Sequence, residues 1–190
     1  MTTVTPVYTV GHSTRELDDF VALLRGHGIT RLVDVRTIPR SRRNPQFNRE
    51  ALPAPLGEAG IAYVHMGGLG GLRSPRADST NTAWRTSGFR GYADYMETAE
   101  FAANLQALIE QARREPLAIM CAEAVPGHCH RSLVSDALVA RGLDVRHVTS
   151  RDPAVAHVLT SFARIDGHRV TYPAPMPCEL PLEGEGRGPV

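Results

Sequence analysis

The sequence predicts an α/β protein: a single three-layer, Rossmann-like domain of about five mainly parallel strands with helices on both faces. Three observations support this fold class. Short, uniformly apolar runs alternate along the chain with amphipathic helical segments, as in a parallel sheet covered on both sides. The length of 190 residues suits one domain, and 42% hydrophobic with 22% charged residues is a globular composition. We predict that residues 1–172 form this domain and that the Pro- and Gly-rich residues 173–190 form a disordered tail.

The first half of the chain contains three predicted strands, at residues 7–10, 32–35 and 61–65. The spacing of Ser13 and Glu16 matches a capping box and predicts the start of a helix. Apolar residues then follow at the spacing of one helix face: Leu17, Phe20, Val21 and Leu24. A polar, basic loop occupies residues 40–45, and Asn48 is a candidate cap for a helix that ends at Ala59.

The second half of the chain begins with a long, Gly-rich irregular segment at residues 66–91. Loops of this length inside a compact domain are usually functional or mobile. A helix is then predicted from apolar residues on one face: Phe101, Leu105, Leu108, Ile109 and Ala112. Two further strands, at 117–122 and 145–148, flank a helix at 131–141. A last helix is predicted from four apolar residues: Val155, Val158, Leu159 and Phe162.

The composition excludes several classes of site. The formal net charge is +1, so no overall field attracts the protein to DNA or to an anionic membrane. All 21 basic residues are Arg, which excludes a Schiff-base lysine and a Walker-A lysine. No segment approaches the roughly 18 apolar residues of a membrane helix, and the first residues do not resemble a signal peptide. Three cysteines, an odd number without a disulfide framework, predict a reducing cytoplasm.

Reactive side chains cluster where the predicted strands end. Because ligands bind outside the carboxyl ends of parallel strands, we expect a site there. The candidate catalytic residues are Cys121, Cys129, Glu123, His65 and His12. The candidate ligand-binding residues are Ser13, Arg36, His130, Arg131, Arg42 and Tyr92. We predict that one pocket is lined by Ser13, Arg36, His65, Cys121 and Arg131.

The richest segment runs from Cys121 to Arg131. Cys129 precedes a helix and lies beside His130 and Arg131, an environment that stabilises a thiolate, so we expect it to react more readily than Cys178. Cys121 is either a second reactive thiol or a small buried hydrophobe. The two cysteines are eight residues apart, which does not match the usual spacing of a structural zinc site. No metal or cofactor is required, although a Cys-Cys-His metal site stays an alternative.

Arginines supply the candidate anion-binding groups. The planar guanidinium groups of Arg36 and Arg131 suit a phosphate or a carboxylate. An ion pair between Arg36 and Asp34, or between Arg36 and Glu123, is the structural alternative. The loop that contains Arg40, Arg42 and Arg43 either grips phosphates or is a solvated basic turn.

Three functional hypotheses follow from these residues. The leading one is a cysteine-dependent hydrolase or transferase that acts on a small anionic or nucleotide-like molecule. The second is a nucleic-acid-associated protein that uses the Arg40–Arg43 loop. Its DNA binding would be weak and non-specific, because the net charge is near zero and no nucleic-acid-binding motif is present. The third is a ligand-binding module without catalysis.

A series of short motifs follows in order along the chain: Gly11-His12-Ser13, Leu32-Val33-Asp34-Val35-Arg36 with Pro39, Phe47, Gly60-Ile61, Tyr63, His65, Leu69-Gly70-Gly71, Phe89, Tyr92, Met120-Cys121-Ala122-Glu123 and Cys129-His130-Arg131. Together these motifs resemble the family called domain of unknown function 488. The resemblance runs from about Tyr8 to about Val148 and implies a cytoplasmic microbial protein with an α/β fold, but no reaction. In that family an aromatic-basic pair often precedes Cys-His-Arg, whereas this chain has Gly127 and His128 there.

Overall fold

The computed structural model describes residues 5–175 and shows a six-stranded sheet at the centre of the fold. The strand order is β3-β2-β4-β1-β5-β6, and every pairing is parallel except that of β5 with β6. The mainly parallel α/β sheet predicted from the apolar runs is therefore confirmed. The strands are β1 (Val7–Gly11), β2 (Arg31–Asp34), β3 (Ala62–His65), β4 (Leu117–Cys121), β5 (Val145–Val148) and β6 (Val155–Ala156).

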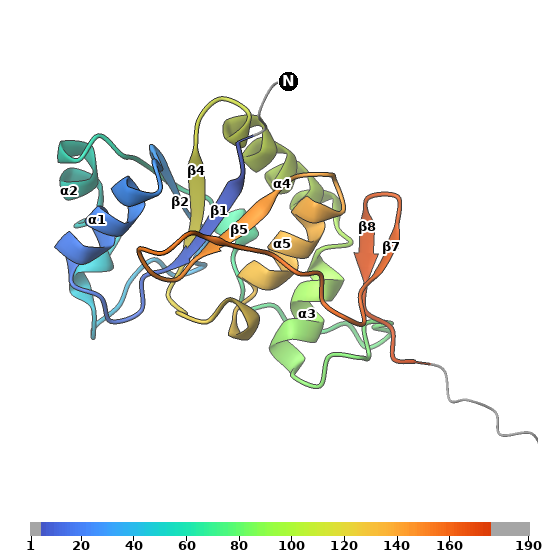
Figure 1. Cartoon of the computed structure of the whole chain (residues 1–190). Coiled ribbons are helices and arrows are strands. Elements are labelled where there is room, and N and C mark those ends of the chain that lie inside the picture. The colour runs from blue at the N-terminus through green and yellow to red at the C-terminus, as the bar shows by residue number, and fades with distance from the viewer. Residues whose placement is uncertain (1–4, 176–190) are drawn as a thin grey trace, which may run out of the picture.

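Helices cover both faces of the sheet, as Figure 1 shows. One face carries α1 (Leu17–Gly26) and α2 (Pro53–Glu58), and the other carries α3 (Ser87–Tyr95), α4 (Ala99–Ala112) and α5 (Arg131–Val139). Three short 3-10 turns complete the helical elements: η1 (Pro45–Phe47), η2 (Gly67–Leu69) and η3 (Pro126–His128). The result is the predicted three-layer arrangement.

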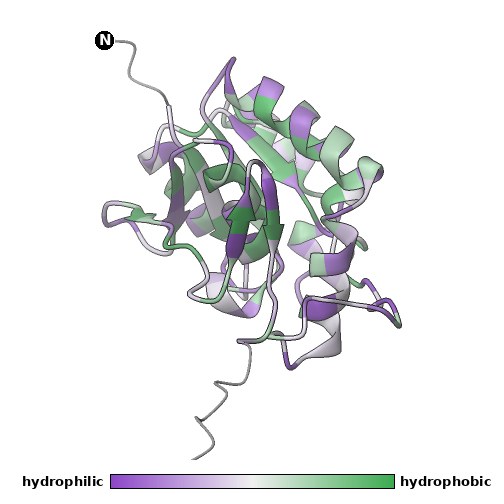
Figure 2. Ribbon diagram, turned by 90° about the vertical axis from the view of Figure 1, so that its right-hand side faces the viewer, coloured by the Kyte–Doolittle hydropathy of each residue, from purple (hydrophilic) through white to green (hydrophobic). Residues whose placement is uncertain are grey.

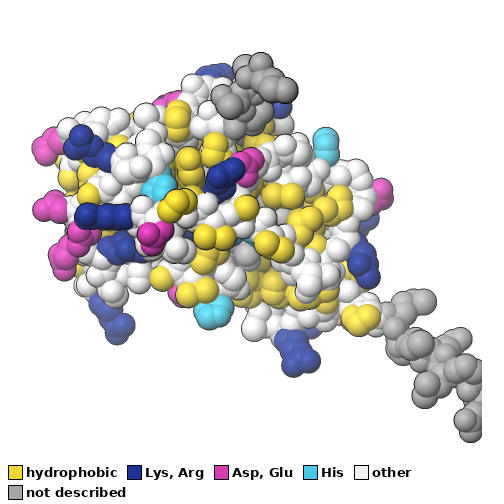
Figure 3. All heavy atoms as spheres, in the orientation of Figure 1, with side chains coloured by type: hydrophobic (Ala, Val, Ile, Leu, Met, Phe, Trp, Pro, Cys, Tyr) yellow, Lys and Arg dark blue, Asp and Glu magenta, His cyan; other side chains and the backbone are white. Residues whose placement is uncertain are grey.

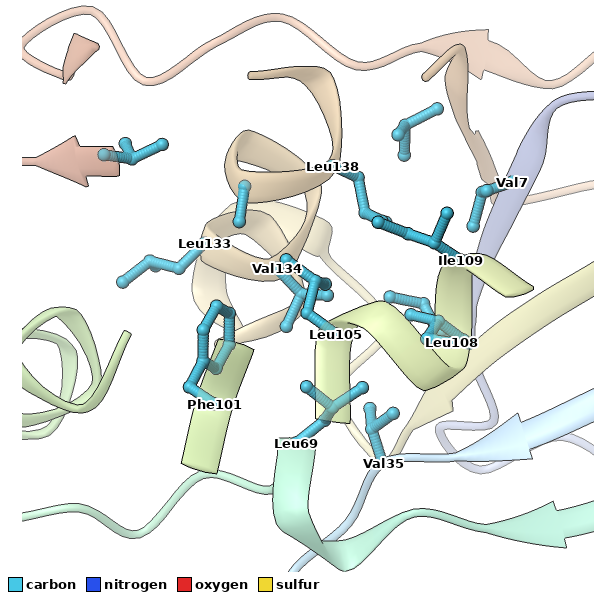
Figure 4. Close-up of a cluster of buried hydrophobic side chains, with 14 of the residues drawn as sticks. Val7, Val35, Leu69, Phe101, Leu105, Leu108, Ile109, Leu133, Val134 and Leu138 are labelled. Carbon is cyan, nitrogen blue, oxygen red and sulfur yellow. The ribbon is translucent and has the colours of Figure 1, made fainter. Parts of the chain in front are cut away.

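The two faces of the sheet bury separate apolar cores because successive side chains of a strand point to opposite sides. In β4, Ala118 and Met120 pack toward α1 and α2, whereas Leu117 and Ile119 pack toward α4 and α5. Figure 2 shows the hydrophobic colour concentrated on the central strands. Figure 4 shows the second core, where side chains of α4 and α5 interdigitate above the sheet. These two cores hold the strand ends in fixed positions.

The adjacent strands β1 and β4 form the switch point of the sheet. The chain leaves β1 through α1 on one face, and it leaves β4 through α5 on the opposite face. The loops that follow the two strands therefore diverge and leave a crevice between them, where open α/β sheets bind their ligands. The first strand ends at Gly11 and the fourth at Cys121, and these two residues are paired.

The helix predicted from Val155, Val158, Leu159 and Phe162 is wrong. Residues 155–156 form β6, which pairs antiparallel with β5, and the chain continues into a hairpin of β7 (Arg164–Asp166) and β8 (Arg169–Thr171). Val158 is 82% exposed, so the four apolar residues do not share one buried face. The free edge of β5 offers backbone hydrogen bonds, and this tertiary pairing overrides the helical spacing.

Three other local predictions need correction. The capping box is wrong, because Glu16 itself occupies the N-cap of α1 and no side chain caps the helix. The helix expected over residues 48–59 is shortened to α2, which starts at Pro53. The segment at 66–91 is not irregular throughout, since it contains η2 and the start of α3. The sequence did not predict α3, because glycines at residues 88 and 91 disfavour a helix. The position of Gly91 inside α3 requires a glycine, because the helix packs closely against the preceding loop there. A Cβ at this position would lie 2.3 Å from the Arg73 carbonyl oxygen.

Only residues 173–175 of the predicted tail belong to the described part of the chain. Residues 176–190, which include Cys178, lie outside the described part of the chain, so their disorder stays a prediction. Within residues 5–175 no helix has the length and apolar character needed to cross a membrane.

Candidate functional site

A cavity of about 530 Å³ opens at the switch point of the sheet, a volume typical of small-molecule sites. Its floor consists of the residues that follow β1 and β4, and its walls come from the loop after β2, the turn after η2 and helix α3. The polar and reactive groups that line it are His12, Ser13, Thr14, Ser41, Arg43, Asn44, Cys121, Glu123, His128, Cys129 and His130. Six of these polar residues are among the candidates predicted from the sequence. His12, Ser13, Cys121 and Glu123 lie at strand ends, and Cys129 and His130 lie just before α5.

The floor of the cavity is built by backbone pairing that continues beyond the strands. The amides of His12 and Ser13 donate to the carbonyls of Cys121 and Ala122, at 3.0 and 2.9 Å. Gly11 permits this approach, because a Cβ at that position would lie 1.9 Å from the carbonyl oxygen of Glu123. The Gly-His-Ser motif thus has a steric reason for its first residue.

Backbone strain concentrates at the cavity. Ser13 and Leu72 are the two non-glycine residues of the described chain with φ in the left-handed region, at 52° and 60°, and both line the cavity. Such a conformation costs on the order of 1 kcal/mol and is found preferentially at functional sites. Leu72 is also 79% exposed, an unusual position for a large apolar side chain. Both observations indicate that the cavity is a functional site.

Two free cysteines lie side by side on the cavity floor. Cys121 is 9% exposed and Cys129 is 4% exposed, and both line the cavity. Their Sγ atoms and one ring nitrogen of His130 lie within 4.8 Å of one another. The backbone amide of Arg131, in the first turn of α5, donates to the Sγ atom of Cys129 at 3.5 Å. The pair therefore combines a helix N-terminus, an imidazole and a nearby guanidinium, the surroundings that stabilise a thiolate.

The two thiols have opposite pKa shifts. The hydrogen bond from Cys129, together with the His130 side chain and the Glu123 amide, outweighs burial and lowers the pKa of Cys121 to about 3. The hydrogen bond to Cys121, burial and the charge of Cys121 raise the pKa of Cys129. The opposite shifts favour one thiolate and one thiol in the pair. The sequence predicts Cys129 as the ionised thiol, whereas in the structure the lowered pKa is that of Cys121.

Arg131 lies beneath the thiols and does not line the cavity. Its side chain is completely buried, and its guanidinium donates to the Thr9 hydroxyl at 3.2 Å and to the Glu123 carbonyl. No carboxylate of the described residues forms an ion pair with it. The expectation that Arg131 clamps a ligand is therefore wrong, because its donors point into the protein. Its uncompensated buried charge instead favours a negative charge on the nearby thiols.

Arg36 is also engaged internally, as the structural alternative anticipated. Its guanidinium forms a two-pronged ion pair with Asp34, with distances of 2.9 and 2.6 Å, and donates to the Phe47 carbonyl at 2.6 Å. A third nitrogen contacts His12 Nε2 at 3.1 Å. The prediction that Arg36 lines the pocket is therefore wrong, since this residue is 6% exposed, is absent from the cavity lining and is bonded to Asp34, Phe47 and His12.

His12 lines the cavity but has no free ring nitrogen. Its Nδ1 contacts the Ser13 carbonyl at 2.8 Å, and its Nε2 faces Arg36, so the ring is a neutral donor and acceptor. Burial and the positive charge of Arg36 lower the pKa of His12. The ring stacks on Phe47 with 4.3 Å between centroids. These contacts give His12 a structural place rather than a free position for proton transfer.

His65 and Arg42 lie away from the cavity. His65 ends the edge strand β3, two strands from β4, and its Nε2 contacts the Arg36 carbonyl at 2.8 Å. The shared pocket predicted for Ser13, Arg36, His65, Cys121 and Arg131 is thus correct only for Ser13 and Cys121. In the basic loop it is Arg43, not Arg42, that lines the cavity.

The aromatic wall of the cavity comes from α3. Phe89 and Tyr92 line it, one turn apart on this helix. The Tyr92 hydroxyl donates to the Leu69 carbonyl at 2.7 Å, so this residue offers its ring rather than its hydroxyl to a ligand. Burial raises the pKa of Tyr92. The sequence did not identify Phe89, Arg43 or Leu72 as site residues. Two of them had a signal: Phe89 belongs to a family motif with Tyr92, and Arg43 belongs to the basic loop. Leu72 had none.

The two thiols and His130 form the cluster that the metal-site alternative requires. Cys121, Cys129 and His130 offer three donor atoms at distances that suit a thiophilic cation such as Zn²⁺. His130 directs Nδ1 to Cys129 Sγ at 3.6 Å and Nε2 to the Val35 carbonyl at 3.2 Å, which is the usual support of a ligating histidine. The buried charge of Arg131 repels a dication at this position, however, and therefore favours a thiolate without a metal.

A comparison with protein-family models matched residues 16–138 to the model described as "Domain of unknown function DUF488". The match covers more than half of the 190-residue chain and includes α1 to α5, with Cys121, Cys129 and Arg131. No curated protein and no solved structure gave a match.

Proposed function

Since the chain belongs to the DUF488 family, whose description names no reaction, we propose a function from the cavity: an enzyme that uses the Cys121 thiolate as a nucleophile on a small anionic, nucleotide-like molecule. The observation that carries the proposal is the thiol pair on the cavity floor, whose two Sγ atoms and one His130 ring nitrogen lie within 4.8 Å of one another, next to the buried Arg131. A thiolate is the nucleophilic form of cysteine, and a neighbouring base or cation is the usual means of activating it.

The cavity walls indicate the substrate class. Arg43 and His128 are exposed basic residues at the cavity, and no ion pair of the described chain involves Arg43. Phe89 and Tyr92 supply an aromatic wall. An anionic group near Arg43 and a flat ring against α3 would together match a nucleotide-like molecule.

The residues suit a two-step displacement. In the first step, the Cys121 sulfur bonds to an electrophilic carbon of the substrate while the bond to the leaving group breaks. The leaving group departs with the electron pair and takes a proton from His128. In the second step, water or an acceptor molecule attacks the same carbon, Glu123 accepts its proton, and the Cys121 thiolate leaves. Water as the second nucleophile gives a hydrolase, and another acceptor gives a transferase.

The alternative of a nucleic-acid-associated protein receives less support. Arg40 pairs with Glu50 at 3.2 Å, and Arg43 faces the cavity, so the loop is not a free row of cations. We propose that any DNA binding is weak, non-specific and lost on adding salt.

A nucleophilic thiol also has to stay reduced, and we therefore propose that the protein works in a reducing compartment such as the cytoplasm.

Alkylation with iodoacetamide tests the proposed nucleophile. We expect Cys121 to be labelled at pH values well below 7, where N-acetylcysteine, with an ordinary thiol pKa of about 8.5, hardly reacts. Peptide mass spectrometry identifies the labelled residue. Cys121→Ser should abolish this early labelling, Cys178→Ser should leave it unchanged, and a chelator should have no effect.

Labelling that starts only near pH 8, or that never occurs in the folded protein, would show that Cys121 is a structural cysteine. A screen of small anionic metabolites then tests the reaction itself. Turnover that is lost in Cys121→Ser supports the enzyme, and turnover that persists in this variant contradicts it.

A further inference from the structure

A buried chain of hydrogen bonds runs from Arg131 across the end of the sheet to Asp136. Nη1 of Arg131 donates to the Thr9 hydroxyl at 3.2 Å, and this hydroxyl lies 2.7 Å from His147 Nδ1. His147 Nε2 lies 2.9 Å from His157 Nδ1, and His157 Nε2 lies 2.8 Å from the Asp136 carboxylate. We call this chain of hydrogen bonds the relay. Its members come from β1 (Thr9), β5 (His147), the residue after β6 (His157) and α5 (Arg131 and Asp136).

One direction of the protons satisfies every group in the relay. Arg131 can only donate, so Thr9 accepts from it, and the hydroxyl proton of Thr9 can then be donated to His147 Nδ1. At the other end, the Asp136 carboxylate also receives the Thr160 amide and the Tyr172 hydroxyl, and it accepts from His157. In this arrangement both histidines are neutral, and His147 carries its proton on Nε2. Burial is the main cause that lowers the pKa of His147 to about 4, in agreement with a neutral ring.

The relay connects the two fully buried charges of the α5 helix. Arg131 and Asp136 are both completely buried and do not touch each other. Buried charges require compensation, and a directed chain of dipoles between a cation and an anion supplies part of it. The relay also holds the guanidinium of Arg131 against the Glu123 carbonyl, while the backbone amide of the same residue donates to Cys129 Sγ. The positive charge of Arg131 acts on the Cys129 thiol, so the relay reaches the thiol pair.

We propose that Thr9, His147 and His157 are positioning residues for the thiolate, because they hold Arg131 in the place where its charge and its backbone amide act on the cysteines. This inference rests on the proposed function of the thiol pair. The titratable and charged groups around the relay are Asp136, Tyr172, His157, His147 and Arg131, and those around the thiols are Cys121, Cys129, His130, Glu123, Tyr92, His12 and Arg36.

Thr9 provides a matched pair of variants. Thr9→Val keeps the shape of the side chain but removes the hydroxyl, so the relay breaks between Arg131 and His147. Thr9→Ser keeps the hydroxyl and therefore the relay. We expect Thr9→Val to move the midpoint of the iodoacetamide profile of Cys121 to higher pH by about one pH unit, since the thiolate loses a fixed positive neighbour. Thr9→Ser should keep the wild-type midpoint.

The measurement is the alkylation rate against pH, taken where circular dichroism shows that each variant is folded. His147→Leu should shift the midpoint in the same direction as Thr9→Val, and His168→Ala, at an exposed histidine, should not. A lower unfolding temperature of Thr9→Val with an unchanged midpoint would overturn the inference, because the relay would then only stabilise the fold. If the wild-type midpoint is that of an ordinary thiol, the proposed function fails instead, independently of the relay.

Discussion

Replacing Arg36 by methionine is expected to lower the free energy of unfolding by about 3–5 kcal/mol, the range measured when one partner of a buried ion pair is removed. Asp34 is completely buried and would lose the guanidinium that binds both of its carboxylate oxygens. The Tyr63 hydroxyl, which donates to Asp34 at 2.7 Å, cannot replace that charge. Urea unfolding followed by circular dichroism measures the difference.

A second substitution separates the charge from the packing. Asp34→Asn in the Arg36→Met background removes the buried charge and still accepts the Tyr63 hydroxyl, so it should restore part of the lost stability. Arg40→Met breaks an ion pair that is exposed on both sides and should leave the unfolding midpoint unchanged. A double variant as unstable as Arg36→Met would contradict the electrostatic explanation.

Gly11→Ala is expected to lower the free energy of unfolding by at least about 2 kcal/mol and to abolish the early alkylation of Cys121. The added Cβ would meet the carbonyl oxygen of Glu123 at 1.9 Å and the Cα of Ala124 at 2.9 Å. Both contacts are with backbone, which cannot turn away as a side chain can. The segment after β4 has to move, and it carries one end of the thiol pair.

Gly26→Ala is the matched control, because a Cβ at this last residue of α1 meets nothing within 4 Å. Its stability should stay the same or rise slightly, since alanine favours helix more than glycine does. Unfolding curves and the alkylation profile are measured for both variants. A Gly11→Ala protein with wild-type stability and wild-type labelling would show that the floor of the cavity adjusts without cost.

The fold class was predictable because each central strand is a short apolar run that must be buried on both faces. The order of the strands was not, since it depends on pairing between distant segments. Because β4 lies between β2 and β1, the edge strand β3 is two strands away from β4 and three from β1, and His65 does not line the cavity. A sequence shows that a residue ends a strand, but not which strands become neighbours.

The two misplaced arginines have a different explanation. Arg36 and Asp34 are two residues apart in extended chain, so their side chains lie on the same side, and the internal ion pair is as consistent with the sequence as a ligand clamp. Arg131 gives no such signal, because its partners are the hydroxyl of Thr9 and a carbonyl of Glu123. The thiol pair also depends on tertiary structure, since it forms only when β4 and the start of α5 are folded together.

Figure 3 shows one face of the molecule, on which apolar side chains form a band across the middle. The chain after β5 crosses this face and includes Val155, which is 62% exposed. The short strand β6 shields the edge of β5, so the band does not coincide with an open row of backbone groups.

The position of β1 at the centre of the sheet affects how the protein is made. Its neighbours, β4 and β5, lie more than a hundred residues further along the chain, with Tyr8 beside Ala118 and Arg146. During synthesis the first strand to leave the ribosome is therefore the one that waits longest for both partners, and parallel pairings of this kind form slowly. A nascent chain that stops before Leu117 leaves an apolar strand with two open edges, the state in which chains aggregate or recruit chaperones.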